Sequence, residues 1–476
     1  MKSSSKMNRA IINFEQKTLD SIHKHSIELL RSTGIKFPCE KALDIFKHHG
    51  FRTASDVVYF KEKDIHNAME SVPATFAIKA RNPAKNIQIG DNNFVLAPGY
   101  GPPFIIDPSG EMRDAGLEDV QNFCKLVQTS KYLDFNSSMV VQPADVPQDT
   151  AHLDILLSTM LLTDKPIMGS SVSKAAAVDS LKMAQMVWGR TMDPVMISLV
   201  DSLAPLQYAA EMVDAILVFA AAGQPLIIHS ACTLGTTGPI TIAGSLVISN
   251  ATTLAGICLA QLVNPGTPIV YGLGGSPTEM KSGGYVNGSP EDANHTAIAA
   301  AMGQYYNIPC RSQGALTESF CLDYQAGMES AMMLTTAALS GVHLCLHACG
   351  TYGSMIAMSY EKFIADEDLC GALKKLIKPV EFTDDAFAME MIKELGTSAN
   401  YMLQLHTVDR CRTEFFRPDL SNQQIHSEWF EMEHRDLTLR AGVLLKKRLA
   451  EYTMPEIGPQ LEKDLSQYVN EQKRNT

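Results

Sequence analysis

The chain has 476 residues, of which 45% are hydrophobic and 19% charged. This composition is typical of a globular protein with a large packed interior, and it excludes a wholly disordered or fibrous chain. The formal net charge of −12 argues against nucleic acid as a partner, because binding to a phosphate backbone depends on an excess of lysine and arginine.

The first part of the chain, residues 1–92, predicts a small α+β extension. Apolar residues recur there at helical spacing in three stretches, and glycines end the first two of them. Short runs of β-forming residues lie between and after these stretches. The expected elements are helices at 15–32, 39–48 and 63–71 and strands at 57–60, 76–80 and 86–89.

The central part, residues 93–395, repeats a simple unit: a short apolar run, a turn rich in Gly, Ser or Pro, and a long helical stretch. Eight such units predict a (β/α)₈ TIM barrel. An open doubly wound sheet is the rival, but the turn Pro98–Pro103 is too rich in proline for a phosphate-binding loop. The expected strands are 94–97, 135–141, 167–171, 195–200, 226–229, 269–271, 308–311 and 342–347.

The last part, residues 396–476, shows no further βα repeat and predicts a helical tail. Pro418–Ser421 has the composition of a turn, and residues 429–452 predict one long charged helix. Such a tail commonly packs across a barrel or against another subunit, so we expect a homo-oligomer.

Two observations bear on where the protein works. The basic start is followed by no apolar segment of a secretion signal, and the ten cysteines lack the spacing of a disulfide scaffold, so we expect a cytoplasmic protein. The uncharged segment 241–263 is long enough to span a bilayer, but polar side chains within it favour a buried barrel helix, namely Ser245, Ser249, Asn250, Thr252, Thr253 and Gln261. We therefore expect no membrane partner.

In a barrel the functional groups lie at the carboxyl ends of the strands, so these positions are the candidate site. On the last strand, alternation predicts that His343, Cys345 and His347 point inward and that Leu344 and Leu346 face the helices. The residues at the strand ends and in the following loops are Tyr100, Gln142, Ser170, Asp201, His229, Tyr271, Gln313, His347, Tyr324 and Tyr352.

Several of these residues admit two interpretations. His347 is a candidate catalytic group or a core histidine, and with His343, Cys345 and Cys349 it could also form a zinc site. For Asp201, a role in forming a turn is favoured over a role as an acid or base. Glu318 and Asp323 could transfer protons, although helix capping explains Asp323 equally well. Six aromatic residues could together hold a trimethylammonium group by cation–π attraction, namely Tyr100, Phe104, Tyr271, Phe320, Tyr324 and Tyr352.

Five stretches, in this order, resemble the trimethylamine methyltransferase superfamily. The match covers most of the chain, and it is specific because the stretches occur in the same order. The five stretches are Ser202–Leu206, Gly238–Gly244 followed by Leu259–Pro268, Gly314–Ser319 through Asp323–Glu329, Ser359–Phe363, and Leu405–Thr407 followed by Pro418–Leu420.

The resemblance implies a (β/α)₈ barrel that works with a separate corrinoid protein. Founding members of the superfamily carry pyrrolysine near residues 311–319, where this chain has only ordinary residues. That departure places it among the relatives that demethylate quaternary amines such as glycine betaine, proline betaine, carnitine or γ-butyrobetaine. A methyl group would pass to the Co(I) corrinoid of the partner protein, with no cofactor bound tightly by this chain.

The resemblance also gives roles to the candidate residues. The expected substrate site combines the six aromatic residues with His229, Gln313 and Glu318, while Arg311 would hold a substrate carboxylate. His347 would contact substrate or corrinoid. Two alternatives stay open: a zinc-dependent corrinoid methyltransferase acting on methanol or a methylthiol, and a non-catalytic betaine-binding protein.

Overall fold

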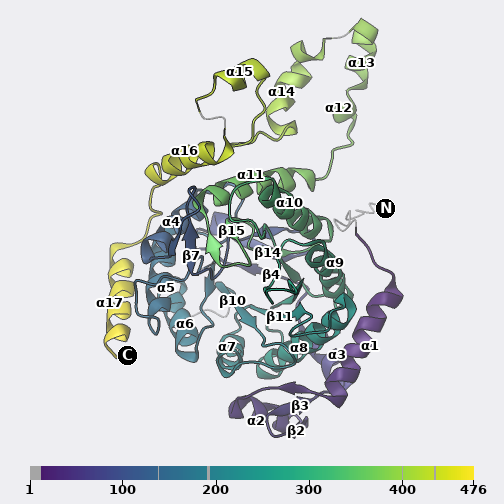
Figure 1. Cartoon of the computed structure of the whole chain (residues 1–476), viewed down its shortest axis with the longest axis vertical. Helices are drawn as coiled ribbons and strands as arrows, with labels where there is room; N and C mark the ends of the chain where they lie inside the picture. Colours follow the sequence, from purple (N-terminus) through teal and green to yellow (C-terminus); the bar gives the residue numbers. More distant parts are fainter. Residues whose placement is uncertain (1–11, 138, 190–192, 399, 434–435, 476) are drawn as a thin grey trace.

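The computed structural model describes residues 12–137, 139–189, 193–398, 400–433 and 436–475, and its centre is a curved parallel sheet ringed by helices (Figure 1). The sheet has seven strands in the order β6-β14-β13-β12-β11-β10-β9, and every neighbouring pair is parallel. Their bounds are β6 Val95–Leu96, β9 Ile167–Gly169, β10 Met196–Asp201, β11 Leu226–Leu234, β12 Ile269–Pro277, β13 Cys310–Gln313 and β14 Leu344–Leu346.

Helices follow the strands and cover the outside of the sheet, as the βα repeat predicts (Figure 1). Each presents an apolar face to the strands, because parallel strands are buried on both sides. These helices are α4 Leu117–Thr129, α5 Ala151–Leu162, α6 Lys174–Trp188, α7 Ala210–Ala221, α8 Ile242–Val263, α9 Pro290–Tyr305, α10 Tyr324–Leu339 and α11 Tyr360–Leu376.

The ring of strands is not closed by a continuous ladder. Of the run 135–141, expected to be a strand, the described residues 135–137 and 139–141 form none; Asn136 makes a single parallel bridge to Ile167. On the other side, the Asp134 amide donates to the Leu96 carbonyl at 2.8 Å. Residues 134–136 thus lie between β6 and β9 but pair with each at one point, so the prediction of eight regular strands is only partly correct.

Helix α8 has the length and apolar composition of a membrane span, but 78% of its most apolar window is buried inside the protein. It packs against α1 (Gln16–Ser32), α3 (Glu62–Ser71) and β11. Its polar residues are buried there, and Thr253, for example, donates a hydrogen bond to the Gly272 carbonyl of β12 at 3.1 Å. The interpretation of this segment as a buried barrel helix is confirmed.

The N-terminal extension is α+β, as expected. It also contains α2 Glu40–His48 and a three-stranded sheet of β1 Ile35–Lys36, β3 Val57–Tyr59 and β2 Arg52–Ala54. The hairpin of β4 Thr75–Ile78 and β5 Ile87–Gly90 places Phe76, Ile78 and Ile89 in the same apolar cluster as the barrel-lining side chains. The hairpin therefore plugs the barrel at the amino ends of the strands.

A second, smaller sheet was not predicted. It joins β7 Phe104–Ile106 and β8 Met112–Asp114 to β15 Thr351–Tyr352 and β16 Ala357–Met358, in the order β15-β16-β7-β8. Its strands come from the loops that follow β6 and β14, two neighbours in the barrel. It therefore lies over the carboxyl ends of these two strands.

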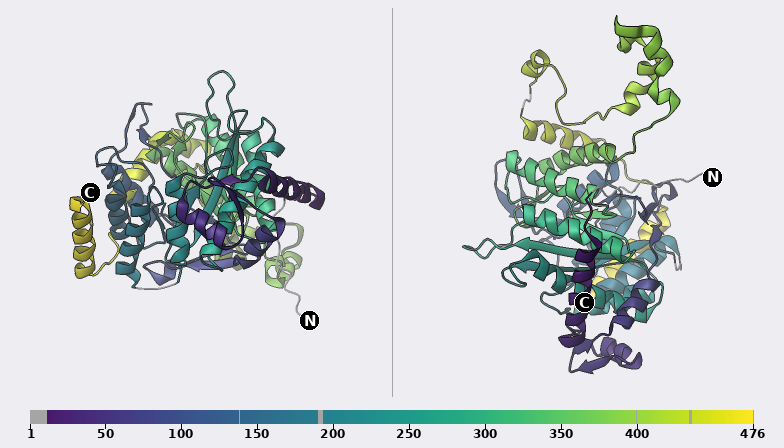
Figure 2. Two further views of the ribbon diagram at one scale, coloured as in Figure 1. Left: turned by 90° about the horizontal axis from the view of Figure 1, so that it is seen from below. Right: turned by 90° about the vertical axis from the view of Figure 1, so that its right-hand side faces the viewer.

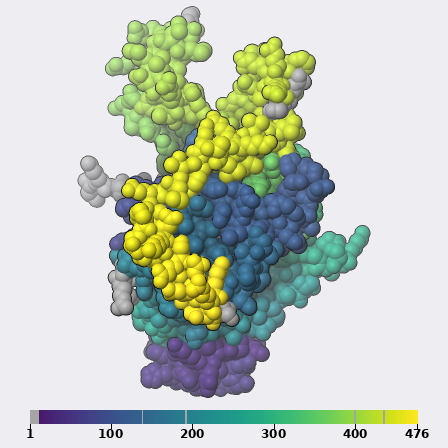
Figure 3. Space-filling model, turned by 90° about the vertical axis from the view of Figure 1, so that its left-hand side faces the viewer, coloured from purple at the N-terminus to yellow at the C-terminus, as the bar shows by residue number. Residues whose placement is uncertain are grey.

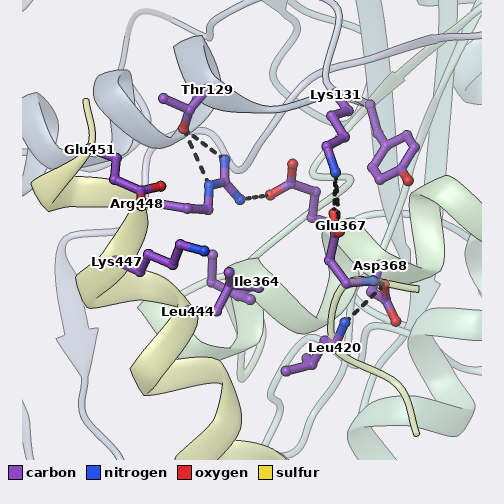
Figure 4. Close-up of a pocket in the computed structure, with 12 residues that line it drawn as sticks. Thr129, Lys131, Ile364, Glu367, Asp368, Leu420, Leu444, Lys447, Arg448 and Glu451 are labelled. Atoms are coloured by element: carbon purple, nitrogen blue, oxygen red, sulfur yellow. Dashed lines mark hydrogen bonds and ion pairs between the residues drawn. The ribbon is translucent and has the colours of Figure 1, made fainter. Parts of the chain in front are cut away.

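The C-terminal tail crosses the outside of the barrel, as expected. The predicted helix 429–452 is divided into α15 His426–Glu431 and α16 Leu437–Ala450, and α17 Pro459–Asn475 follows. Figure 3 shows α16 and α17 lying diagonally over the helices of the barrel. Where α16 crosses the barrel, Arg448 pairs with Glu367 of α11 (Figure 4). The Tyr468 hydroxyl of α17 donates to Asp179 of α6 at 2.6 Å.

Residues 377–436, between α11 and α16, project from the side of the barrel, and we call this segment the arm (Figures 1 and 2). It contains α12 Asp384–Phe387, α13 Met389–Leu395, α14 Leu405–Glu414 and α15. The amides of Asp419, Leu420 and Ser421 donate to the Asp368 carboxylate of α11. This contact fixes the turn predicted at 418–421 to the barrel.

Candidate functional site

The interior of the barrel is identified by an apolar cluster that includes Ile197, Ile227, Val270, Leu344 and Leu346. Leu344 and Leu346 therefore face inward, and Cys345 belongs to the outer cluster beneath the helices. The predicted alternation of β14 is thus wrong, because the strand is offset by one residue from the expected register.

His347 nevertheless reaches the interior. Its φ of +55° lies in the left-handed region, which interrupts the alternation directly after β14. The imidazole is 4% exposed and interacts electrostatically with Arg311, Asp201 and His229. The predicted inward position of His347 is therefore correct, although the strand alternation from which it was predicted is not.

Four charged or titratable side chains meet at the carboxyl ends of the strands, and we call their surroundings the polar chamber. Asp201 ends β10 and His229 stands beside it in register on β11, with His229 Nδ1 hydrogen-bonded to the Asp201 carboxylate. Arg311 of β13 and His347 complete the group. The interpretation of Asp201 as a turn-former is wrong, since its carboxylate is an acidic group of the site.

Glycines on β12 make room for the histidine rings. A Cβ at Gly274 would lie 2.8 Å from His229 Nε2, and one at Gly275 would lie 2.5 Å from the His295 ring. Any larger residue would displace an imidazole. The Gly-Leu-Gly-Gly run at 272–275 is therefore the local sequence feature that shapes this side of the chamber.

Burial controls the charges in the chamber. Desolvation, reinforced by Arg311, lowers the pKa of His347 to about 3, and the same two causes lower the pKa of His229. Burial opposes ionisation of Asp201, but the hydrogen bond from His229 and the charge of Arg311 outweigh it and lower the pKa of this carboxyl. Near neutral pH the chamber thus holds one anion, Asp201, and one cation, Arg311, with neutral imidazoles between.

A further group of polar residues adjoins the chamber from α9 and was missed by the sequence analysis. Asp292 and His295 are three residues apart on the buried face of α9, and Asn287 precedes the helix. Burial raises the pKa of Asp292 to about 7, and burial together with His229 lowers that of His295 to about 3. Their helical spacing on an otherwise alanine-rich helix was the available signal.

Many polar atoms around the chamber are buried without a hydrogen-bond partner. They include Nε and one terminal nitrogen of Arg311, Nδ1 of His347, Oε1 of Gln313, and both ring nitrogens of His295. Among the residues described, no carboxylate lies within 4 Å of Arg311 to form an ion pair. Buried polar groups are almost always paired, so these atoms are available to a polar ligand or to bound water.

A cavity of about 460 Å³ lies beside the chamber, lined by Tyr100, Gln142, Ser170, His152 and other residues of the same side. Burial, followed by the nearby Asp201, raises the pKa of Tyr100 to about 12, so its phenol stays protonated and presents an uncharged ring. Three of the predicted strand-end residues, Tyr100, Gln142 and Ser170, therefore line the same cavity.

Two of the predicted aromatic residues lie away from the chamber. Tyr271 points outward, because it occupies the opposite face of β12 from the chamber, and its hydroxyl donates to Asn250 of α8 at 2.7 Å. Tyr324 is 84% exposed at the start of α10. The assignments of Tyr271 and Tyr324 to a cage are therefore corrected. Phe104 and Tyr352 pack in the small sheet, and Phe320, half exposed, lies against Gly353, so their contact with a substrate stays a prediction.

Glu318 and Asp323 have structural partners. Glu318 accepts hydrogen bonds from the Asn287 amide at 2.6 Å and from the Ser354 amide and hydroxyl, so it ties together the loops after β12, β13 and β14. This replaces the expected contact with substrate. Asp323 caps α10 by accepting from the Ala326 amide at 2.9 Å, which supports the capping interpretation.

The side chains that the sequence suggested as zinc ligands lie in different places. His343 lies at the amino end of β14, where Nδ1 accepts from the Cys310 amide and Nε2 contacts the Asp91 carbonyl. Cys345 faces the helices, and Cys349 lies 3.8 Å from Cys370. Within the described residues no group of three or more His, Cys, Asp or Glu side chains could hold a metal ion.

Residues 3–476 match the trimethylamine methyltransferase (MTTB) family. The chain belongs to this family. It is 37% identical over 455 residues to the glycine betaine methyltransferase of Desulfitobacterium hafniense (strain Y51), covering 95% of each chain. It is 31% identical to the proline betaine:corrinoid methyltransferase of Eubacterium limosum, covering 96% of each. The resemblance stated from the sequence is confirmed.

A solved structure supports the fold. The monomethylamine methyltransferase of Methanosarcina barkeri superposes with a TM-score of 0.55 at 11% sequence identity, covering 94% of this chain and 90% of that one. An identity this low supports the shared architecture alone.

One of the family-like stretches has a clear structural role. Lys362, within Ser359–Phe363, is fully buried and donates to the Ala315 carbonyl and the Ser330 hydroxyl, both at 3.0 Å, and to Asp366. Asp366 in turn accepts from the Gly350 amide at 2.8 Å. This pair anchors the loops after β13 and β14, which flank Gln313 and His347 of the chamber.

Proposed function

We propose that the protein demethylates a quaternary amine that carries a carboxylate and transfers the methyl group to the Co(I) corrinoid of a separate protein in the cytoplasm. Family membership and the names of the glycine betaine and proline betaine relatives support this class of reaction. A third relative, the L-carnitine:corrinoid methyltransferase of Eubacterium limosum, is 30% identical over 476 residues.

The observation that carries the proposal is the pairing of opposite charges in the polar chamber. A betaine is a zwitterion, with a trimethylammonium at one end and a carboxylate at the other. Arg311, with unpaired buried nitrogens, can hold the carboxylate. Asp201, which holds His229 by a hydrogen bond, can attract the cation, and the Tyr100 ring stands beside it.

The chemistry requires positioning more than proton transfer. A Co(I) corrinoid on the partner protein would supply the electron pair of the new bond to the methyl carbon and become methyl-Co(III), while the electron pair of the C–N bond would stay on nitrogen. The amine therefore departs neutral and needs no general acid. This accords with neutral His229 and His347, which contribute hydrogen bonds and exclude water rather than supply protons.

We also infer that the scaffold is a (β/α)₈ barrel, with residues 134–136 in the place of the eighth strand. Their contacts to Leu96 on one side and Ile167 on the other support this arrangement.

The test uses the purified full chain, its cognate corrinoid protein and reduced cobalamin. The substrates are glycine betaine, proline betaine, carnitine, γ-butyrobetaine, trimethylamine, tetramethylammonium, methanol and a methylthiol, and the readout is the absorbance change on cobalt methylation. We expect methylation by at least one betaine, with tetramethylammonium slower and trimethylamine silent. Binding of a betaine without methylation would favour a binding protein, and activity with methanol or a methylthiol would favour the zinc-dependent class.

A further inference from the structure

Polar side chains continue from Arg311 toward the mouth of the barrel. Ser276 of β12 is fully buried, and Gln313 of β13 is 5% exposed. Ser276 Oγ, Gln313 Oε1 and two nitrogens of Arg311 make no hydrogen bond of normal geometry to the described residues. Buried polar atoms are rarely left unpaired, so these three side chains can bind a ligand together.

Strand register places these side chains on one wall of the chamber. Gly272 of β12 lies beside Arg311 of β13, and Val270 marks the inward face of β12. Because alternate residues of a strand share a face, Gly274 and Ser276 follow on the same inward side. The two glycines carry no side chain, so Ser276 supplies the first polar group of β12 toward the mouth.

The loop between β12 and α9 folds back and brings Tyr285 to this wall. The Val286 amide donates to the Pro277 carbonyl at 3.0 Å, and the Ser354 hydroxyl donates to the Tyr285 carbonyl at 2.5 Å. Glu318 accepts from the amide two residues further along the loop. The backbone at Tyr285 is therefore held by the end of β12 and by the loops after β13 and β14.

The Tyr285 phenol is a hydrogen-bond donor at neutral pH. Its hydroxyl lies near Ser276 and Gln313. Arg311 and Asp292 are close enough to act on it electrostatically. Burial, followed by Asp292, raises the pKa of Tyr285 to about 12 and outweighs the opposing effect of the other neighbours. The side chain as a whole is partly exposed, so the ring stands between this wall and solvent.

The groups on this wall favour an anion. Arg311 supplies a cation, and the hydroxyls of Ser276 and Tyr285 supply two neutral donors. Of the two nearby carboxyl groups, Glu318 already accepts three hydrogen bonds from the surrounding loops. Burial raises the pKa of Asp292 to about 7, so much of this group is protonated at neutral pH. A carboxylate that meets a guanidinium and two hydroxyls gains charge-assisted hydrogen bonds.

The opposite wall fits the cationic end of a betaine. Asp201 of β10 and Arg311 of β13 occupy the same register position, three strands apart. Tyr100 lies near Asp201. The chamber is therefore acidic and aromatic on one side, and basic and rich in hydroxyl groups on the other. A betaine fits in one orientation, with its ammonium group toward β10 and its carboxylate toward β12 and β13.

We propose that Tyr285 is a specificity-determining residue, whose hydroxyl joins Arg311 and Ser276 in binding the substrate carboxylate and whose ring closes this end of the chamber. The inference rests on the proposed function, because it assumes a substrate that carries a carboxylate. It goes further by assigning that carboxylate to the wall of β12 and β13, and by naming the loop after β12 as the segment that recognises it.

Calorimetric titration of the purified full chain, without corrinoid protein, tests the proposal. The ligands are glycine betaine, proline betaine, carnitine, γ-butyrobetaine and tetramethylammonium. For each betaine that binds the wild type, Tyr285→Phe should raise Kd about tenfold, because a hydrogen bond to a charged group is lost. Ser276→Ala should have a similar effect. For tetramethylammonium, which has no carboxylate, Kd should stay within about twofold of the wild type in both variants.

Two further variants separate recognition from a structural effect. Tyr324→Phe removes the hydroxyl of a tyrosine that is 84% exposed at the start of α10, and it should leave every Kd unchanged. In the double variant Tyr285→Phe/Arg311→Gln, the two losses of betaine affinity should be less than additive, because both side chains bind the same carboxylate.

The outcomes distinguish this inference from the proposed function. If no betaine binds the wild type, the proposed function fails, and the inference fails with it. If a betaine binds and Tyr285→Phe keeps the wild-type Kd, only the inference fails, and water occupies this wall instead. Equal losses of affinity for a betaine and for tetramethylammonium also overturn the inference, because they place the effect on the cation or on the fold.

Discussion

Asp201 and His229 occupy the same register position on the neighbouring strands β10 and β11, and the hydrogen bond between them fixes His229 Nδ1 on the acid. The other ring nitrogen, Nε2, is buried without a partner and faces the chamber. The pair thus orients an imidazole for ligand binding while keeping one anion beside the expected position of the ammonium group.

Replacing Asp201 should test this pair directly. Asp201→Asn removes the charge and keeps the shape, so we expect kcat/KM with a betaine to fall about 10- to 100-fold, the worth of one hydrogen bond to a charged group. Glu211→Gln on the exposed side of α7 is the control and should leave the rate unchanged. An Asp201→Asn enzyme with wild-type rates would contradict the assigned role.

Arg311 should decide recognition of the carboxylate. Arg311→Gln should raise KM for a betaine about 10- to 100-fold, because a charge-assisted contact is lost. Turnover of tetramethylammonium, which has no carboxylate, should change less than about threefold. Equal losses with both substrates would show that Arg311 supports the fold rather than the substrate, and the exposed Arg31→Gln serves as the control.

Gly274 should tolerate no side chain. Gly274→Ala would place a Cβ 2.8 Å from His229 Nε2, and the ring cannot move freely because Asp201 holds its other side. We expect kcat/KM to fall at least about tenfold, comparable to a displaced catalytic-site group. Gly327→Ala of α10 meets no atom within 4 Å and should be neutral or slightly stabilising.

Asp292 should make stability depend on pH. Burial raises its pKa from 3.8 to about 7, so between these values the folded chain holds a proton that the unfolded chain has lost. The contribution of Asp292 to stability therefore falls as pH rises through this window. Asp292→Asn should match the wild type near pH 4 and exceed its Tm by about 2–5 °C at pH 8. A constant difference across pH would contradict this assignment.

The Lys362–Asp366 pair should support the fold strongly. Lys362→Met leaves the Asp366 carboxyl buried without its cation, so the free energy of unfolding should drop by about 3–5 kcal/mol in urea titrations. Lys131→Met, which breaks the exposed pair with Asp419, should cost about 0–1 kcal/mol. Similar losses for the two variants would show that burial does not control the contribution of Lys362.

Part of this molecule could be predicted from sequence because it depends on local periodicity. The spacing of apolar runs gave seven of the parallel strands and their helices, and the strand-end rule placed Tyr100, His229, Arg311, Gln313 and His347 at or beside the chamber. Ordered motifs were enough to identify the family. These signals depend on positions within one element or on the order of elements along the chain.

Tertiary structure alone decided which of these residues meet. Tyr271 was misplaced because the face of a strand depends on its register with both neighbours, and one residue of offset reverses it. His347 enters the chamber because its own backbone is left-handed, and Asp292 and His295 adjoin the chamber from α9, the helix that follows β12. Tyr285 likewise reaches the chamber only in three dimensions, because the hydrogen bonds that hold its loop come from residues far along the chain.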